Sequence, residues 1–103
     1  MTNEEFEVVV EEAIQRSKKT LNEKGKEYTG ETDRLEMFQL AGDLQSIPET
    51  QALFGMATKH IISIANMVKR PSDYTKEQWY EKTGDLRNYT ILLEAVLVDI
   101  GVE

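Results

Sequence analysis

Residues 75–100, TKEQWYEKTGDLRNYTILLEAVLVDI, decide the fold class of this chain. Their apolar residues recur three or four positions apart, which is the spacing of a helix with one buried face. These residues are Trp79, Leu86, Tyr89, Leu92, Leu93, Val96 and Leu97. Thr75 and Gln78 have the spacing of a capping box, in which each side chain satisfies a backbone group at the helix start. The stretch predicts a helix from about Lys76 to Ile100.

The same periodicity predicts a first helix from Thr2 to about Lys26, and Thr2 and Glu5 again have capping-box spacing. Its apolar residues are expected to form one buried face. They are Phe6, Val9, Val10, Ala13, Ile14 and Leu21. A turn is expected over residues 25–32, because two glycines are combined there with polar residues.

Two more helices are predicted between these. The second runs from about Asp33 to Leu44, and the third begins with Ser46 as its cap and Pro48 in its first turn. The connections are short, and no alternating strand pattern is present. The chain is therefore predicted to be one all-α domain over residues 1–103, arranged as an antiparallel four-helix bundle. A swapped or dimeric arrangement gives the same pattern.

The composition restricts the class of protein. Of the 103 residues 40% are hydrophobic and 30% are charged, as in globular domains, and no apolar run is long enough to span a membrane. With no signal-peptide pattern, a soluble cytoplasmic protein with no membrane partner is expected. The absence of cysteine leaves carboxylates and one histidine as potential metal ligands. A net charge of −7 opposes binding of duplex nucleic acid, whereas a small phosphorylated ligand can still bind beside local cations.

The sharpest candidate site lies on the predicted fourth helix. Glu81, Asp85 and Asn88 follow one another at steps of three or four, so they share a stripe that continues as apolar core. A carboxylate that faces the interior stays ionised only if it is compensated, and Mg²⁺ bound between two carboxylates and a substrate phosphate would compensate it. The alternative is that these residues face solvent or pair with Lys82 and Arg87.

Candidate contacts to a phosphate and a base lie on the other helices. His60 lies along the apolar face of the predicted third helix and Lys59 lies at the border of that face, where both would contact a phosphate. The alternative is a surface lysine and a core-edge histidine. Lys24, Lys26 and Tyr28 lie near the end of the first helix. The tyrosine could stack on a base and the lysines could neutralise phosphates, although a solvated helix end fits equally well.

Several short motifs, taken together, resemble a family of small phage and prophage proteins. They are Lys24-Gly25-Lys26-Glu27-Tyr28, Asp33-Arg34-Leu35 with Phe38, Lys59-His60 with Ile64, Glu81-Lys82, and Gly84-Asp85-Leu86 with Asn88-Tyr89. These proteins are similar to the all-α nucleoside triphosphate pyrophosphohydrolase superfamily, the MazG-like group, near the families called nucleotide-modification-associated domains. The resemblance implies a four-helix core that forms dimers or larger oligomers. It also implies acidic residues that bind Mg²⁺ and cleave nucleotides between the α and β phosphates.

Carried onto this chain, the resemblance implies that Glu81 and Asp85 bind Mg²⁺ and are catalytic. The residues expected to bind the substrate are Lys24, Tyr28, Lys59, His60, Asn88 and Tyr89. Members of the superfamily generally have a second acidic pair on the preceding core helix, where this chain has Lys59 and His60.

Three hypotheses follow for the function of the chain. The first is a homo-oligomeric enzyme that hydrolyses a nucleoside triphosphate to the monophosphate and pyrophosphate with Mg²⁺. The second is a non-catalytic protein that binds or sequesters a nucleotide and uses Glu81 and Asp85 as partners for its own cations. The third is a structural adaptor whose polar cluster sets the register of the bundle.

Overall fold

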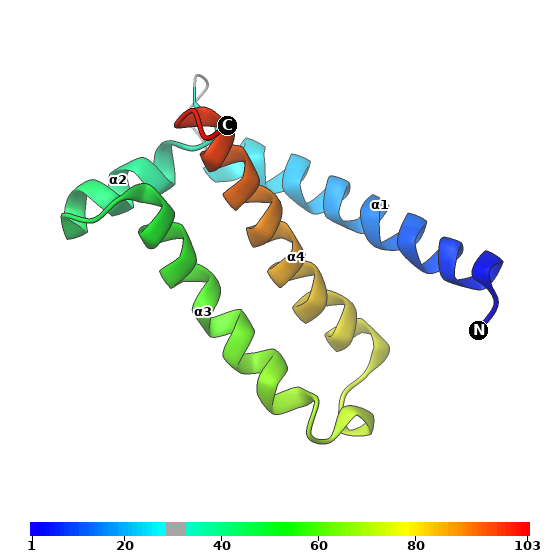
Figure 1. The fold of residues 1–103 in the computed structure, drawn as a ribbon. Helices are drawn as coiled ribbons and strands as arrows, with labels where there is room; N and C mark the ends of the chain where they lie inside the picture. The colour runs from blue at the N-terminus through cyan, green and yellow to red at the C-terminus, as the bar shows by residue number, and fades with distance from the viewer. Residues whose placement is uncertain (29–32) are drawn as a thin grey trace.

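A computed structural model describes residues 1–28 and 33–103, with side chains for residues 1–25 and 33–103. Every regular element of these residues is helical (Figure 1). The elements are α1 (Asn3–Tyr28), α2 (Glu36–Gln45), α3 (Glu49–Met67), the 3₁₀ helix η1 (Pro71–Asp73) and α4 (Lys76–Asp99). The prediction of an all-α chain with four α-helices is confirmed. None of the helices in the described residues combines the length and the apolar character needed to cross a membrane.

Hydrogen bonds at two helix starts match the predicted capping boxes, fully at α4 and by one of the two bonds at α1. At α4 the backbone N–H of Gln78 donates to Thr75 Oγ1 over 3.1 Å, and the N–H of Thr75 donates to Gln78 Oε1 over 2.8 Å. At α1 the N–H of Glu5 donates to Thr2 Oγ1 over 3.1 Å. Each bond satisfies a backbone donor that the helix itself leaves without a partner.

The prediction that Ser46 caps the third helix is wrong. Ser46 instead ends α2 in the left-handed conformation, with φ 57° and ψ 42°, and Pro48 occupies the N-cap position of α3. The turn is tight, because the N–H of Ile47 donates to the carbonyl of Gly42 over 3.0 Å. A Cβ on Gly42 would lie only 2.8 Å from the carbonyl oxygen of Ile47. Because the backbone at Ile47 passes so close to Gly42, Ser46 lies at the end of α2 and not at the start of α3.

The predicted turn over residues 25–32 begins too early. α1 continues as a helix through Gly25 to Tyr28, while residues 29–32 lie outside the described part of the chain. Gly25 leaves space for the Arg34 side chain, since a Cβ there would lie 2.9 Å from Arg34 Nε. Arg34 Nη2 donates to the carbonyl of Leu21 over 3.2 Å. Gly25 thus accommodates the Arg34 side chain where it crosses α1. Gly25 does not end the helix.

The buried core is formed by α2, α3, α4 and the residue that precedes α2. Its members are Leu35, Phe38, Leu53 and Val96, with Met56, Tyr89, Leu92 and Leu93 packed against them. Leu53 and Val96 are the most deeply buried, with 1% and 0% of their surface exposed. Burying such a side chain contributes about 1.5–3 kcal/mol. α3 and α4 lie side by side and run in opposite directions, as expected for an antiparallel bundle (Figure 1).

α1 departs from the predicted bundle arrangement. It crosses α4, and its N-terminal half extends away from the other helices (Figure 1). Consequently the expected burial of its apolar face within this chain is wrong for four of the six residues, while Ala13 and Leu21 are half-buried. Phe6 and Ile14 are 57% and 42% exposed, and Val9 and Val10 are exposed as well. Among residues 3–25 of α1, Ser17 is the one buried residue, and it lies at the crossing itself.

The connection between α3 and α4 is fixed by an aromatic pair. Trp79 Nε1 donates to the carbonyl of Pro71, in η1, over 2.9 Å. Tyr74 meets the same indole edge to face, with ring centroids 6.0 Å apart. The first turn of α4 is therefore tied to the short 3₁₀ helix that precedes it.

Candidate functional site

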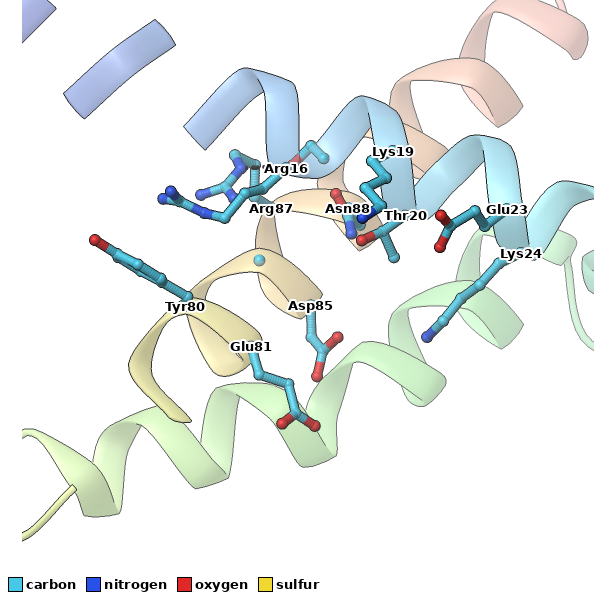
Figure 2. A pocket seen from close by; sticks show the side chains of 12 residues that line it. Arg16, Lys19, Thr20, Glu23, Lys24, Tyr80, Glu81, Asp85, Arg87 and Asn88 are labelled. Carbon is cyan, nitrogen blue, oxygen red and sulfur yellow. Dashed lines mark hydrogen bonds between the residues drawn. The ribbon is translucent and has the colours of Figure 1, made fainter. Parts of the chain in front are cut away.

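A pocket of about 490 Å³ opens where α1 crosses α4. Residues between 16 and 24 of α1 and between 80 and 88 of α4 line it (Figure 2). Its volume lies within the range of about 300–1,000 Å³ that is typical of small-molecule sites. Most of its side chains are charged or polar, so we refer to it as the polar pocket.

A second pocket, of about 250 Å³, adjoins the polar pocket. The two pockets share Thr20, Lys24, Asp85 and Asn88. The remaining walls of the second pocket are mainly aliphatic and aromatic, so we call it the apolar pocket. They are formed by Leu21, Arg34, Met37, Phe38, Tyr89 and Leu92.

Asp85 connects the pockets to α3. Its Oδ2 lies 3.5 Å from His60 Nδ1, and the His60 ring packs on Tyr89 with centroids 5.2 Å apart. Burial lowers the pKa of His60; the charge of Asp85 opposes this shift, while nearby lysines, first Lys59, add to it. Burial, followed by the charge of Asp85, raises the pKa of Tyr89. His60 is thus neutral more often than an exposed histidine at the same pH. It contacts Asp85 from the α3 side.

The structure brings five of the predicted site residues to the pockets. Lys24, Asp85 and Asn88 line both pockets, Glu81 lines the polar pocket and Tyr89 lines the apolar pocket. Lys59 and His60 line neither pocket. Lys59 is exposed, and His60 lies behind Asp85 and Tyr89. The side chain of Tyr28 is outside the described residues.

The two carboxylates of the predicted metal site differ in environment. Glu81 is exposed, whereas Asp85 is half-buried, and among the described residues neither pairs with Lys82 or Arg87. No group of three or more histidine, aspartate or glutamate side chains in the described part of the chain could hold a metal ion. Mg²⁺ bound by one or two carboxylates takes its other ligands from water and substrate phosphates. Glu81 and Asp85 therefore do not form a complete magnesium site by themselves.

Sequence reasoning missed the residues at the α1–α4 crossing. Arg87 faces α1, and its Nε donates to Ser17 Oγ over 2.7 Å. The guanidinium carbon of Arg16 lies 3.8 Å from the centre of the Tyr80 ring. One signal was present: Ser17 falls three residues after Ile14 and thus on the predicted buried face of its helix, where a polar residue needs a partner.

Three buried polar atoms around the polar pocket have no hydrogen-bond partner among the described residues. They are Arg16 Nε, Arg87 Nη2 and Asn88 Oδ1. Burial, and then the positive charge of Arg16, lowers the pKa of Arg87, although a guanidinium stays protonated under all ordinary conditions. No carboxylate in the described part of the chain pairs with either arginine. This end of the pocket therefore carries positive charge that the described residues do not neutralise.

Comparisons of the chain with protein-family models, with curated proteins and with solved structures found no match. The case for a function therefore depends on the two pockets and on the side chains that line them.

Proposed function

We propose that the chain binds a nucleotide, or a closely similar phosphorylated small molecule, across the two adjoining pockets. The observation that carries this proposal is the contrast between them. The polar pocket contains unneutralised arginines, while the apolar pocket has aromatic and aliphatic walls, and the two share one boundary. A nucleotide requires both environments, because its base is a flat ring and its phosphates are anions.

The apolar pocket suits the base. Phe38 and Leu92 provide apolar contacts, and Tyr89 provides an aromatic face. Asn88, at the boundary, is 8% exposed and its Oδ1 accepts no hydrogen bond from a described residue. Such an atom is costly to bury unless a donor reaches it. An N–H of the base or a hydroxyl of the sugar would satisfy Asn88.

The phosphates would then lie in the polar pocket. Lys24 lines both pockets and lies beside Glu23, at the end of the polar pocket away from Tyr80 (Figure 2). In this proposal it contacts the first phosphate. The net charge of −7 does not oppose this placement, because local cations outweigh distant charges that are screened by salt. Asp85, 3.5 Å from His60, acts in this proposal as a partner of that imidazole and needs no metal ion.

A second candidate function is Mg²⁺-dependent hydrolysis of a nucleoside triphosphate to the monophosphate and pyrophosphate. The observation that favours it is that Glu81 and Asp85 both line the polar pocket, one helical turn apart. The ion would need phosphate oxygens and water to complete its coordination. Binding without hydrolysis is preferred, since it requires no group beyond the side chains already present.

Self-association is a further part of the proposal. The exposed apolar residues in the N-terminal half of α1, which include Phe6, Val9 and Ile14, form a face that the chain itself leaves open. Faces of this kind often mark protein–protein interfaces. A mass above that of one chain in light scattering, reduced by Val9→Glu, would support a homo-oligomer; a monomer at all concentrations would refute it.

Titration calorimetry with adenosine, AMP and ATP, each with and without Mg²⁺, tests the proposed function. We expect metal-independent binding of the phosphorylated ligands. Lys24→Gln should weaken it, while Lys18→Gln, an exposed control on the same helix and outside both pockets, should not.

Chromatography of the same mixtures separates the alternatives. Intact ligand favours a binding protein. Mg²⁺-dependent release of pyrophosphate that disappears in Asp85→Asn would establish the hydrolase. If no nucleotide binds, the proposed function is wrong and a structural adaptor becomes the better hypothesis.

A further inference from the structure

Two arginines line one end of the polar pocket, and no carboxylate among the described residues pairs with either. Arg16 comes from α1 and Arg87 from α4, and Figure 2 shows both side chains beside Tyr80. They are close enough for the charge of Arg16 to help lower the pKa of Arg87. Two like charges held together in a partly buried place are unfavourable unless an anion joins them.

Other contacts hold these side chains in position in the absence of a ligand. The Ser17 hydroxyl, on a residue that is 3% exposed, accepts a hydrogen bond from Arg87 Nε over 2.7 Å. Arg16 stacks on Tyr80 at 3.8 Å, and Lys76 Nζ lies 5.5 Å from the centre of the same ring. A ligand would therefore find the cations already placed, which reduces the entropy lost on binding.

The acidic side chains of the polar pocket lie away from this pair. Figure 2 shows Glu23 at the Lys24 end, and Glu81 with Asp85 on the side toward α3. The chain has 19 acidic and 12 basic residues, so a pair of arginines without an acidic partner is not what its composition favours. Arg87 Nη2 is left as a buried donor without an acceptor among the described residues.

We propose that Arg16 and Arg87 form a clamp for a pyrophosphate group, at the end of the polar pocket farther from the apolar pocket. Guanidinium forks donate two parallel hydrogen bonds to phosphate oxygens. Arg87 Nη2 is a buried donor with no acceptor among the described residues, and a phosphate oxygen that reached it would satisfy it. Neither arginine lines the apolar pocket. Because the base and the clamp would lie in different pockets, a chain of phosphates would join them, and the proposed ligand class is a nucleoside di- or triphosphate. The proposed clamp depends on the placement of the two arginines, whereas the inference that the ligand carries a base rests on the proposed function.

Titration calorimetry with metal-free sodium pyrophosphate tests the clamp directly. We expect saturable binding that Arg16→Gln and Arg87→Gln each weaken about tenfold or more, because a charge-assisted hydrogen bond is lost. Arg87→Lys should also weaken binding, since it keeps the charge but loses the fork. Arg70→Gln, an exposed arginine outside both pockets, is the matched control and should bind like the wild type.

The thermal unfolding midpoint separates loss of the clamp from loss of the fold. Arg87→Gln loses the hydrogen bond to Ser17 as well as an unneutralised charge, so its midpoint is compared with that of Ser17→Ala, which loses the same bond and keeps the guanidinium. Pyrophosphate should raise the midpoint of the wild type more than sulfate at equal ionic strength. If pyrophosphate does not bind, or binds equally to the arginine variants and to Arg70→Gln, the clamp is wrong.

The nucleotide arm keeps the two proposals apart. AMP binding that is strong and insensitive to Arg16→Gln, with no gain for ADP, overturns the clamp and leaves the nucleotide pocket intact. If pyrophosphate binding depends on the arginines and ADP binds no more tightly than pyrophosphate, the clamp is supported and the proposed nucleotide binding is refuted. Both proposals are supported if ADP binds more tightly than either AMP or pyrophosphate, and if Arg16→Gln removes its advantage over AMP.

Discussion

The two sides of α4 are built from different kinds of side chain. Toward α2 and α3 it buries Val96 beside Leu53, and these two residues are 0% and 1% exposed. Toward α1 it presents Arg87, which is hydrogen-bonded to Ser17, and Tyr80 beneath a guanidinium. The first interface stabilises the fold by excluding water, whereas the second keeps polar atoms beside a pocket. The buried core and the proposed ligand site thus lie on separate faces of one helix, and substitutions can test this separation.

The largest effect is expected in the core. Leu53→Ala should lower the free energy of unfolding by about 2–5 kcal/mol, because it removes a fully buried side chain and leaves a cavity. Urea unfolding followed by circular dichroism measures it. Ile62→Ala on the same helix, at a position that is 56% exposed, should change stability by less than about 0.5 kcal/mol. Equal losses in both variants would show that the core has been placed wrongly.

Two glycines should respond in opposite directions to the same substitution. Gly42→Ala should cost about 1–3 kcal/mol, since the added Cβ would lie 2.8 Å from the backbone oxygen of Ile47. Gly55→Ala, within α3 and with no atom beyond the neighbouring helix backbone within 4 Å of its Cβ position, should stabilise the chain by about 0.5–1 kcal/mol. Urea midpoints measure both. If Gly42→Ala costs nothing, the tight return after α2 is not under steric constraint.

Hydrogen exchange can sharpen the contrast between α1 and α3. Amides of residues 6–14 lie in a helix with little tertiary burial, so they should exchange faster than those of residues 53–61 in dilute solution. Protection of residues 6–14 should rise with protein concentration if a second copy covers them. Protection that is as high as in α3 at every concentration would contradict the open position of α1.

The smallest effect concerns His60. Its pKa is lowered in the fold, mainly by burial, so its contribution to stability is present above the usual value of 6.5 and is lost as the pH falls through the lowered value. Between pH 7.5 and pH 5.5 the wild type should therefore lose more stability than His60→Gln. Asp85→Asn should lower the pKa of His60 further, because Asp85 is the charge that raises it. An NMR titration that shows a higher pKa in Asp85→Asn would contradict this account.

Local features of the sequence predicted local structure well. Thr75 and Gln78 predicted the start of α4 because a capping box involves four consecutive residues. The prediction that Ser46 caps the third helix failed because a serine can also end a helix in the left-handed conformation. The close approach of the chain to Gly42 favours this second role. The apolar face of α1 was visible in the sequence, but periodicity indicates which side of a helix is apolar and says nothing about what covers it.

The candidate site was predicted in part for the same reason. Asp85, Asn88 and Tyr89 come from one helix, so their spacing was enough to place them together. The pair of Ser17 and Arg87 joins residues 70 positions apart, and it depends on the angle at which α1 crosses α4. Residue spacing cannot predict that angle, so the arginines at the crossing could be identified only in the structure.

Trp79 provides this chain with a built-in optical reporter. It is the only tryptophan among the 103 residues, and its indole N–H is fixed to the carbonyl of Pro71 over 2.9 Å. Its emission therefore follows the opening of the α3–α4 connection, while circular dichroism follows all helices together. A fluorescence transition that precedes the dichroic one on heating would mean that this hairpin opens first. Coincident transitions would mean that the small domain unfolds as one unit.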